Sequence, residues 1–230
     1  MMNKNIVVIG SSRGIGLEVA RQFSADENNT VWALSRFSNN ETIFDHSTTI
    51  HIRKIDLASP QLLENMKAIL EEIDTVDILI NNAGYLVNKP FSELTYQDIL
   101  TSYQTNIIGV MLLTQEVVKY ASKNGLHIVN ISSMGGFQGT VKFPGLAAYS
   151  SSKAALVNFT ELFAEEYKET TIKMNCLCLG AVQTEMLEEA FPGYVAPTTP
   201  SEMANYIVDF AQTGMKFFNG KILPVSISTP

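Results

Sequence analysis

A tyrosine, a lysine and a pair of serines are the residues whose types and spacing could carry out proton transfer. Tyr149 and Lys153 stand four residues apart at the start of a helical pattern, so their side chains share one helix face. A nearby ammonium group favours the phenolate and lowers the tyrosine pKa toward working pH, as a general acid/base requires. Ser132 and Ser133 end an upstream strand, where a hydroxyl could hold a substrate oxygen. In isolation, an ordinary pair on a surface helix is the better interpretation of the tyrosine and the lysine.

The same spacing occurs a second time, at Tyr85 and Lys89, but Pro90 follows directly. Proline disfavours helical backbone at the residue before it, so these two side chains need not converge. We therefore expect the second pair to take no part in the chemistry.

A glycine-rich turn connects the first expected strand to the first expected helix. Its sequence is Gly10-Ser11-Ser12-Arg13-Gly14-Ile15-Gly16. Glycines allow a tight turn and let the backbone approach a pyrophosphate at the helix N-terminus. The spacing differs from the commonest dinucleotide fingerprint, G-x-G-x-x-G. By itself the turn is a weak signal, because a strand-to-helix turn that binds nothing could have the same composition.

The end of the second expected strand favours a cofactor that carries a 2′-phosphate. Many NAD-binding folds have an acidic residue there, which binds the ribose 2′-hydroxyl. In this sequence Ser35 and Arg36 take that place, and Arg13 would lie on the same side. With no carboxylate to repel a phosphate and two guanidinium groups to bind it, the sequence predicts NADP(H) rather than NAD(H).

The elements that must position these residues alternate between strands and helices. Short apolar runs predict strands at residues 6–9, 31–34, 50–55, 76–80, 127–131, 173–179 and 221–227. Helical patterns lie around residues 15–23, 60–72, 95–122 and 149–168 and after Pro200. This order predicts an α/β fold, a doubly wound parallel sheet in a Rossmann-like three-layer sandwich, with one domain over residues 1–230.

Composition and charge exclude several classes of protein. The 230 residues are 46% hydrophobic and 17% charged, which is typical of a folded globular chain and not of a disordered one. The net charge of −7 and the scattered basic residues speak against a nucleic-acid or membrane surface. No apolar run approaches the roughly 18 residues of a membrane span and no signal peptide is visible, so we expect a cytoplasmic location.

The cysteines and histidines predict no metal site. Cys176 and Cys178 lie two apart in an apolar run, which offers poor disulfide geometry and too few ligands for zinc. We expect two buried thiols. The histidines His46, His51 and His127 form no ligand or triad spacing, and we expect each of them at the surface.

Taken together, the motifs and their order resemble the short-chain dehydrogenase/reductase family, in its compact single-domain branch, over nearly the whole chain. The resemblance rests on the glycine turn, Asp56-Leu57, Asn81-Asn82-Ala83-Gly84, Asn106, Ile131-Ser132-Ser133, Tyr149 with Lys153, and Gly180 to Thr184. It implies an NADP(H)-dependent oxidoreductase of the carbonyl reductase type. Such an enzyme transfers a hydride between the nicotinamide and a ketone, an aldehyde or a secondary alcohol.

The resemblance also implies a role for each catalytic position. Tyr149 would be the general acid/base, Lys153 would lower its pKa and bond the nicotinamide ribose, and Ser133 would orient the substrate oxygen. Asn106 would hold a water that links Lys153 to solvent. Asparagine is a poor helix-interior residue, which fits a local distortion of the long helix at this point, although a plain surface asparagine would look the same.

The remaining matched positions would bind the cofactor. Asp56 would bond the adenine amino group, although it could instead be only the N-cap of the next turn. Val182 would bond the nicotinamide carboxamide through its backbone, and Thr184 would contact the amide or the pyrophosphate. The full implied set is Gly10, Ser12, Arg13, Gly14, Ile15, Gly16, Ser35, Arg36, Asp56, Leu57, Asn82, Ala83, Gly84, Tyr149, Lys153, Gly180, Val182 and Thr184.

Three departures from the family pattern concern loops. Ile9 replaces the usual threonine before the first glycine, and Leu179 replaces the usual proline before Gly180. The segment between Ser133 and Tyr149 is longer than usual and rich in glycine, so it must fold outward if those two side chains are to meet. Because these departures could lower activity, a dinucleotide-sensing regulatory protein stays open as the alternative function.

Residues 185–199 match the region that closes over substrate in the family, and their aromatic residues predict an apolar pocket for a small carbonyl compound or alcohol. An isomerase, a dehydratase or a nucleotide-sugar epimerase on a related fold is disfavoured, because those chains usually carry a longer C-terminal substrate domain. The long helices at 95–122 and 149–168 have apolar residues beyond one stripe, so we expect a homodimer or homotetramer, as in the family.

Overall fold

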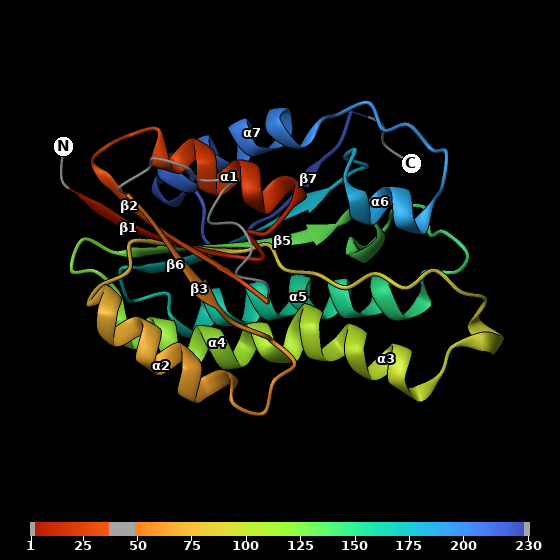
Figure 1. Ribbon diagram of the computed structural model, residues 1–230, viewed down its shortest axis with the longest axis horizontal. Coiled ribbons are helices and arrows are strands. Elements are labelled where there is room, and N and C mark those ends of the chain that lie inside the picture. The colour runs from red at the N-terminus through yellow and green to blue at the C-terminus, as the bar shows by residue number, and fades with distance from the viewer. Residues whose placement is uncertain (1–2, 37–48, 228–230) are drawn as a thin grey trace.

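A parallel β-sheet forms the centre of the computed structural model, which describes residues 3–36 and 49–227. The seven-stranded sheet has the order β3-β2-β1-β4-β5-β6-β7, and each neighbouring pair is parallel. Its strands are β1 Lys4–Ile9, β2 Asn29–Ser35, β3 Ile50–Lys54, β4 Ile78–Asn81, β5 Leu126–Ser133, β6 Ile172–Leu179 and β7 Ile222–Val225. Helices cover both faces of the sheet (Figure 1), which confirms the predicted Rossmann-like sandwich.

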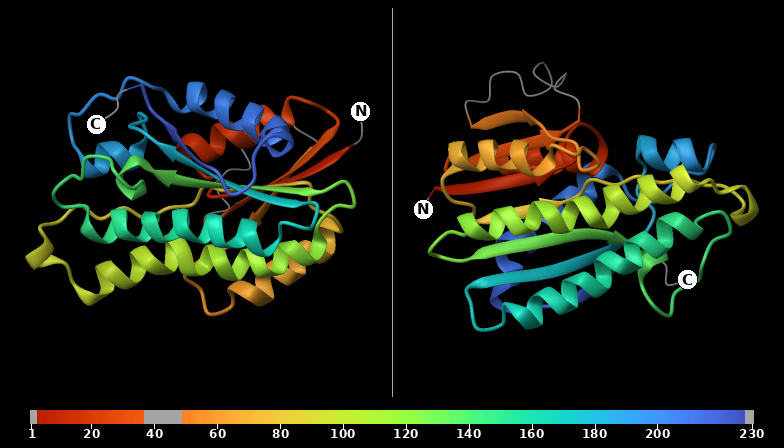
Figure 2. Two further views of the ribbon diagram at one scale, coloured as in Figure 1. Left: turned by 180° about the vertical axis from the view of Figure 1, so that it is seen from behind. Right: turned by 90° about the horizontal axis from the view of Figure 1, so that it is seen from below.

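Two groups of helices enclose the sheet, as Figures 1 and 2 show. On one face lie α1 (Gly14–Ser24) and α7 (Pro200–Thr213), which pack against each other. The other face carries α2 (Leu62–Ile73), α3 (Tyr96–Tyr103), α4 (Gly109–Val117) and α5 (Ala147–Glu166). Strands are added outward in both directions from β1 and β4, so the strand order reverses there. In open α/β sheets, ligands bind at the carboxyl ends of the strands beside such a point.

The first strand shows why the sequence pattern is a continuous apolar run. Val7 and Ile9 pack into the core under α2 and α4, whereas Ile6 and Val8 pack into the core under α1 and α7. All four side chains are at most 1% exposed. Because both faces of a doubly wound sheet are covered, apolar side chains occupy both faces of this strand.

The long helical segment expected at residues 95–122 is divided in the structure. It begins with a capping box, in which the Thr95 side chain and the Asp98 side chain each bond the other residue's backbone N–H. Between α3 and α4 a π-helical turn spans Gln104–Ile108 and contains Asn106. This turn confirms the local distortion that the asparagine predicted, and such turns are frequent at functional sites.

A short helix, α6 (Glu185–Ala190), lies within residues 185–199, where the sequence pattern predicted no helix. It begins after Thr184, whose hydroxyl accepts a hydrogen bond from the Leu187 N–H. The Gln183 N–H donates to the Thr198 carbonyl at 2.9 Å, which closes the base of the whole segment. Six residues are too few to show a helical period, which explains why the helix was not predicted.

The buried thiols are confirmed, but the expectation for the histidines was wrong at His127. Cys176 and Cys178 are fully buried and unbridged. His127 is also fully buried, because α7 covers the start of β5 and both ring nitrogens find partners, the Ala211 carbonyl at 2.8 Å and the Asn175 side chain at 3.0 Å. His51 stacks on a tryptophan ring and is half-buried, while His46 lies outside the described residues.

Within residues 3–36 and 49–227, no helix is long and apolar enough to cross a membrane.

Candidate active site

A cavity of about 550 Å³ opens at the carboxyl ends of the central strands. Its walls come from the glycine turn, the loops after β2, β3 and β4, the end of β5, the first turns of α5, and the segment after β6 that contains α6. Apart from Gly16 and Asn106, every site residue that the sequence predicted lines this one cavity: Gly10, Ser12, Arg13, Gly14, Ile15, Ser35, Arg36, Asp56, Leu57, Asn82, Ala83, Gly84, Ser133, Tyr149, Lys153, Gly180, Val182 and Thr184.

The glycine turn forms a wall with no room for side chains. Gly10 has a φ of 84°, and a Cβ there would lie 2.6 Å from the Ala83 Cα. A Cβ on Gly16, which lies behind the cavity wall, would collide with the Gly10 carbonyl oxygen and the Asn82 side chain. The Asn82 side-chain amide donates to that same carbonyl at 2.9 Å and holds the turn in place. Backbone N–H groups of such a turn can approach a pyrophosphate closely.

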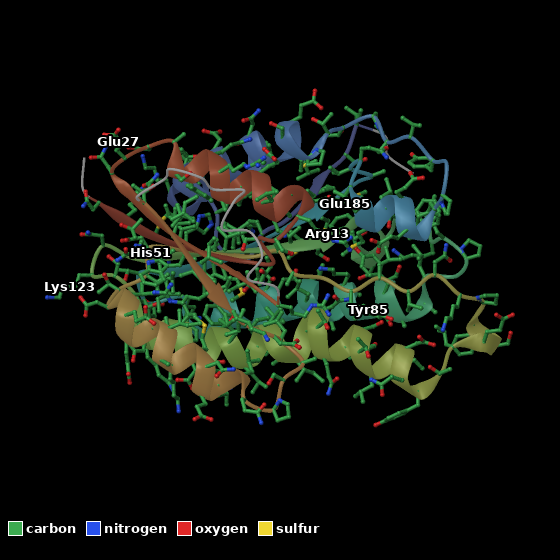
Figure 3. All side chains as sticks on the ribbon, viewed as in Figure 1. Arg13, Glu27, His51, Tyr85, Lys123 and Glu185 are labelled. Carbon is green, nitrogen blue, oxygen red and sulfur yellow. The ribbon has the colours of Figure 1, made fainter. Side chains whose placement is uncertain are left out.

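The two arginines expected near a 2′-phosphate line the same cavity but differ in their surroundings. Arg36 is exposed at the end of β2. Arg13 forms an ion pair with Glu189 of α6 at 2.5 Å, and this hydrogen bond raises the pKa of Arg13 above its usual value. Figure 3 labels Arg13 and Glu185 close together at this end of the sheet, and both side chains line the cavity. Sequence reasoning missed the contact with α6, because no local pattern pairs residues so far apart.

Tyr149 and Ser133 meet, although a long loop separates them in the chain. A side-chain hydrogen bond with Ser133 lowers the pKa of Tyr149, but burial of the phenol raises it by more, so the net shift is upward. The connecting loop folds outward and packs on α5. A Cβ on Gly136 would come within 2.7 Å of the Lys153 backbone, which shows why this loop needs a glycine at its closest approach to the helix.

Lys153 is 4% exposed and lies at the floor of the cavity. Its amine donates to the Ile131 carbonyl at 2.8 Å, and burial lowers its pKa to about 8. The Lys153 ammonium therefore hydrogen-bonds the backbone of β5 and not the Tyr149 phenol. That Lys153 lowers the pKa of Tyr149 stays a prediction.

Asn106 lies beneath the cavity and is fully buried, so it is not a plain surface residue. Its side-chain amide donates to the Tyr85 carbonyl at 2.9 Å and to the Ser152 hydroxyl at 2.8 Å, and its oxygen accepts from the Tyr85 N–H at 2.8 Å. The π-helical turn thus ties the loop after β4 to α5. A Cβ on Gly84 would be 3.6 Å from both the Asn106 oxygen and the Lys153 amine.

Two smaller expectations concern Lys89 and Asp56. Lys89 is in a segment without helical structure and pairs with Asp98 at 2.8 Å, away from the cavity lining. Asp56 lines the cavity, and its carboxylate also accepts the Ala58 N–H at 3.0 Å. It therefore caps a turn before α2, whose own N-cap is Gln61. The turn-capping contact and the predicted adenine contact are compatible, since a carboxylate has two oxygens.

Known proteins resemble this chain over nearly its whole length. The model of the short chain dehydrogenase family matches residues 4–194. The 3-oxoacyl-(acyl-carrier-protein) reductase FabG of Chlamydia trachomatis is 24% identical over 98% of this chain and 96% of the relative. A putative ketoacyl reductase of Streptomyces coelicolor is 31% identical over 88% of each chain.

Solved structures agree with this match. A 4-hydroxyisoleucine dehydrogenase complexed with NADH superposes with a TM-score of 0.85 at 26% identity, covering 97% of both chains. A variant actinorhodin polyketide ketoreductase with NADPH has a TM-score of 0.84 at 28% identity, covering 98% of this chain and 97% of its own. On the family match, the shared fold and the cavity described above, this chain belongs to the short-chain dehydrogenase family of oxidoreductases.

Proposed function

We propose that this oxidoreductase uses NADP(H) to interconvert a small ketone or aldehyde and the corresponding alcohol, with Tyr149 as the general acid/base. One observation carries the proposal: Tyr149, Ser133 and Lys153 line the same cavity as the glycine turn. A proton donor and a dinucleotide site therefore share one space, which is what a carbonyl reduction needs.

The residues present fit a dinucleotide. The glycine turn offers backbone at a place where a Cβ on Gly10 would already collide with the Ala83 backbone. Arg36 and Arg13 line this wall and would bind a 2′-phosphate, while Asp56 would bond the adenine. NADPH and NADP are bound in similar solved structures, the polyketide ketoreductase and ElxO. NADH is bound in the 4-hydroxyisoleucine dehydrogenase, so the choice of NADP(H) rests on the arginines.

In the proposed reduction, the bound nicotinamide supplies the hydride and the protein supplies the proton. The raised pKa of Tyr149 keeps the phenol protonated, so that its hydroxyl can donate to the carbonyl oxygen. Ser133 would hydrogen-bond the same oxygen and stabilise its developing negative charge. With a pKa of about 8, Lys153 is mostly protonated at neutral pH, and its positive charge would stabilise the phenolate that forms.

Asn106 would support the step that returns a proton from solvent to the Tyr149 phenolate after the reduction. Its side chain is fully occupied with Tyr85 and Ser152, so it would act by holding the π-helical turn in place beside Lys153. A water held at this turn would link the lysine to solvent.

The helices on the α4 and α5 face also support an oligomer. Ile108 and Met111 are 44% and 41% exposed, and Leu162 of α5 is 64% exposed. Exposed apolar side chains of this kind suit a subunit interface. A homodimer or homotetramer is the corresponding proposal, and elution as a monomer in size-exclusion chromatography would refute it.

The substitution Tyr149→Phe tests the catalytic assignment. We expect NADPH oxidation against a panel of ketones and aldehydes to fall by about 10²–10⁴-fold, with the Kd for NADPH little changed. Tyr85→Phe, from the second Tyr–Lys pair, is the matched control and should retain wild-type turnover. Turnover retained in Tyr149→Phe would refute the assignment. A wild-type protein that binds NADPH tightly and turns over no carbonyl would favour the dinucleotide-sensing alternative.

A further inference from the structure

In the part of the chain that the structure describes, the substrate end of the cavity has apolar walls. Its walls include Met134, Phe143 and Leu146 from the loop before α5, and Met186, Leu187 and Phe191 from α6 and its C-terminal end. Among the described residues, the charged members of the cavity lining are Arg13, Arg36, Asp56, Lys153 and Glu185.

The cations of this lining are all placed away from those apolar walls or already engaged. Arg36 is at the end of β2, on the side proposed for the 2′-phosphate. Lys153 donates to the Ile131 carbonyl, and Arg13 is paired with Glu189. In the proposed complex the 2′-phosphate takes up Arg36 and Arg13 and the Ile131 carbonyl takes up Lys153, so none of the three is left for an anionic group of the substrate.

Among the described residues, the segment that contains α6 adds only negative charge to the substrate end. From residue 174 to residue 215 the sequence has no lysine, arginine or histidine, while α6 alone contributes Glu185, Glu188 and Glu189. In the opposite loop, Lys142 lies outside the cavity lining and donates to the Phe137 carbonyl at 2.6 Å. An anionic substrate that approached beside α6 would be repelled by these carboxylates.

We infer that the substrate is a neutral, largely apolar ketone or aldehyde, and that this cavity discriminates against carbonyl compounds bearing a carboxylate or a phosphate-linked arm such as that of coenzyme A. The inference deepens the proposed function and rests on it. An anion in the apolar walls would lose its hydration without gaining a partner. Glu185 lines the same cavity with its carboxylate beside the glycine turn, 3.5 Å from where a Cβ on Gly14 would lie, and it adds a like charge that would repel such a ligand. Two of the similar proteins are named for ketoacyl substrates, so the inference separates this chain from them.

Three compounds with the same ketone test it: ethyl acetoacetate, acetoacetate and acetoacetyl-CoA. Their binding is measured by calorimetry on the wild-type protein saturated with NADP⁺, which cannot react with a ketone because both are already oxidised. We expect the neutral ester to bind at least about tenfold more tightly than the acid or the thioester. Equal or tighter binding of acetoacetate or acetoacetyl-CoA would overturn the inference.

A charge variant tests the cause. In Glu185→Gln, the affinity for acetoacetate relative to that for the ester should rise by about three- to tenfold, the effect of removing one like charge at a partly solvated site. Glu71→Gln, on the exposed side of α2, is the control and should leave the ratio unchanged. If the ratio of the affinity for acetoacetate to that for the ester is unchanged in Glu185→Gln, the inference that Glu185 repels anionic substrates is refuted.

Kinetics with NADPH separate the two proposals. If the ester binds preferentially but none of the three is reduced, the proposed reaction fails while the inference about ligand charge holds. If acetoacetate or acetoacetyl-CoA is reduced in preference to the ester, the proposed reaction holds and the inference fails.

Discussion

The ion pair between Arg13 and Glu189 leads to a prediction about cofactor affinity. Glu189 engages the guanidinium group that we propose for binding the 2′-phosphate of NADP(H). The phosphate must therefore compete with this carboxylate for Arg13. We expect Glu189→Gln to tighten NADPH binding, because the substitution releases the guanidinium and removes a negative charge near the phosphate.

The exposure of the pair sets the size of the effect. The Arg13 guanidinium nitrogen and the Glu189 carboxylate oxygen are 2.5 Å apart. The Arg13 side chain is 48% exposed and the Glu189 side chain is 64% exposed, so water and salt screen the interaction. Exposed pairs contribute about 0.2–1 kcal/mol. Since about 1.4 kcal/mol corresponds to a factor of ten, releasing Arg13 should lower the Kd for NADPH by about 1.4- to 5-fold.

Fluorescence titration of NADPH and NADH at low and high salt measures the change. NADH has no 2′-phosphate, so its Kd should change less than that of NADPH, and the difference should shrink at high salt. Glu188→Gln removes the same charge from the neighbouring position, whose carboxylate accepts the Gly193 N–H, and serves as the control. A Kd for NADPH that is unchanged or raised in Glu189→Gln, or an equal shift for both cofactors, would refute the competition.

Two further predictions concern stability. Gly16→Ala should lower the free energy of unfolding by about 1–3 kcal/mol in urea denaturation, because its Cβ would strike the Gly10 carbonyl and the Asn82 side chain. Gly84→Ala, whose Cβ would meet ordinary contacts at 3.6 Å, should cost less, and equal costs would contradict the steric reasoning. Burial lowers the pKa of His127, so the unfolded chain binds its proton first as the pH falls through about 6.5, and the native state loses stability from there downward. The slope of unfolding free energy against pH in this range should be smaller in His127→Gln, and an identical slope would show that other groups cause it.

Much of the site could be predicted from the sequence because its residues follow the ends of strands. Parallel strands bring their carboxyl ends to one edge, so Gly10, Asn82 and Ser133 had to converge once β1, β4 and β5 were located. The strands themselves were readable, since burial on both faces leaves continuous apolar runs. Asn106 was the single sequence signal for the π-helical turn, because asparagine is unfavourable inside a regular helix.

The hydrogen-bond and ion-pair partners of the long polar side chains could not be predicted from the sequence. An arginine or lysine can reach any of several acceptors, and the one it finds depends on how distant loops fold over it. Arg13 therefore pairs with Glu189 of an unpredicted helix, and the Lys153 ammonium bonds the Ile131 carbonyl. His127 was misjudged for the same reason, because α7, which covers it, comes from a distant part of the chain.

By itself, then, the sequence determined the alternation of strands with the longer helices, the glycine turn and the set of residues that meet at the carboxyl edge of the sheet. These features depend on neighbouring residues and on local periodicity, which a single chain displays directly. The tertiary structure alone decided the contacts made by Arg13, Lys153 and His127, and the negative charge that α6 places beside the cavity. Those depend on the packing of segments far apart in the chain, and the balance of charge and burial at the site exists only once they are packed.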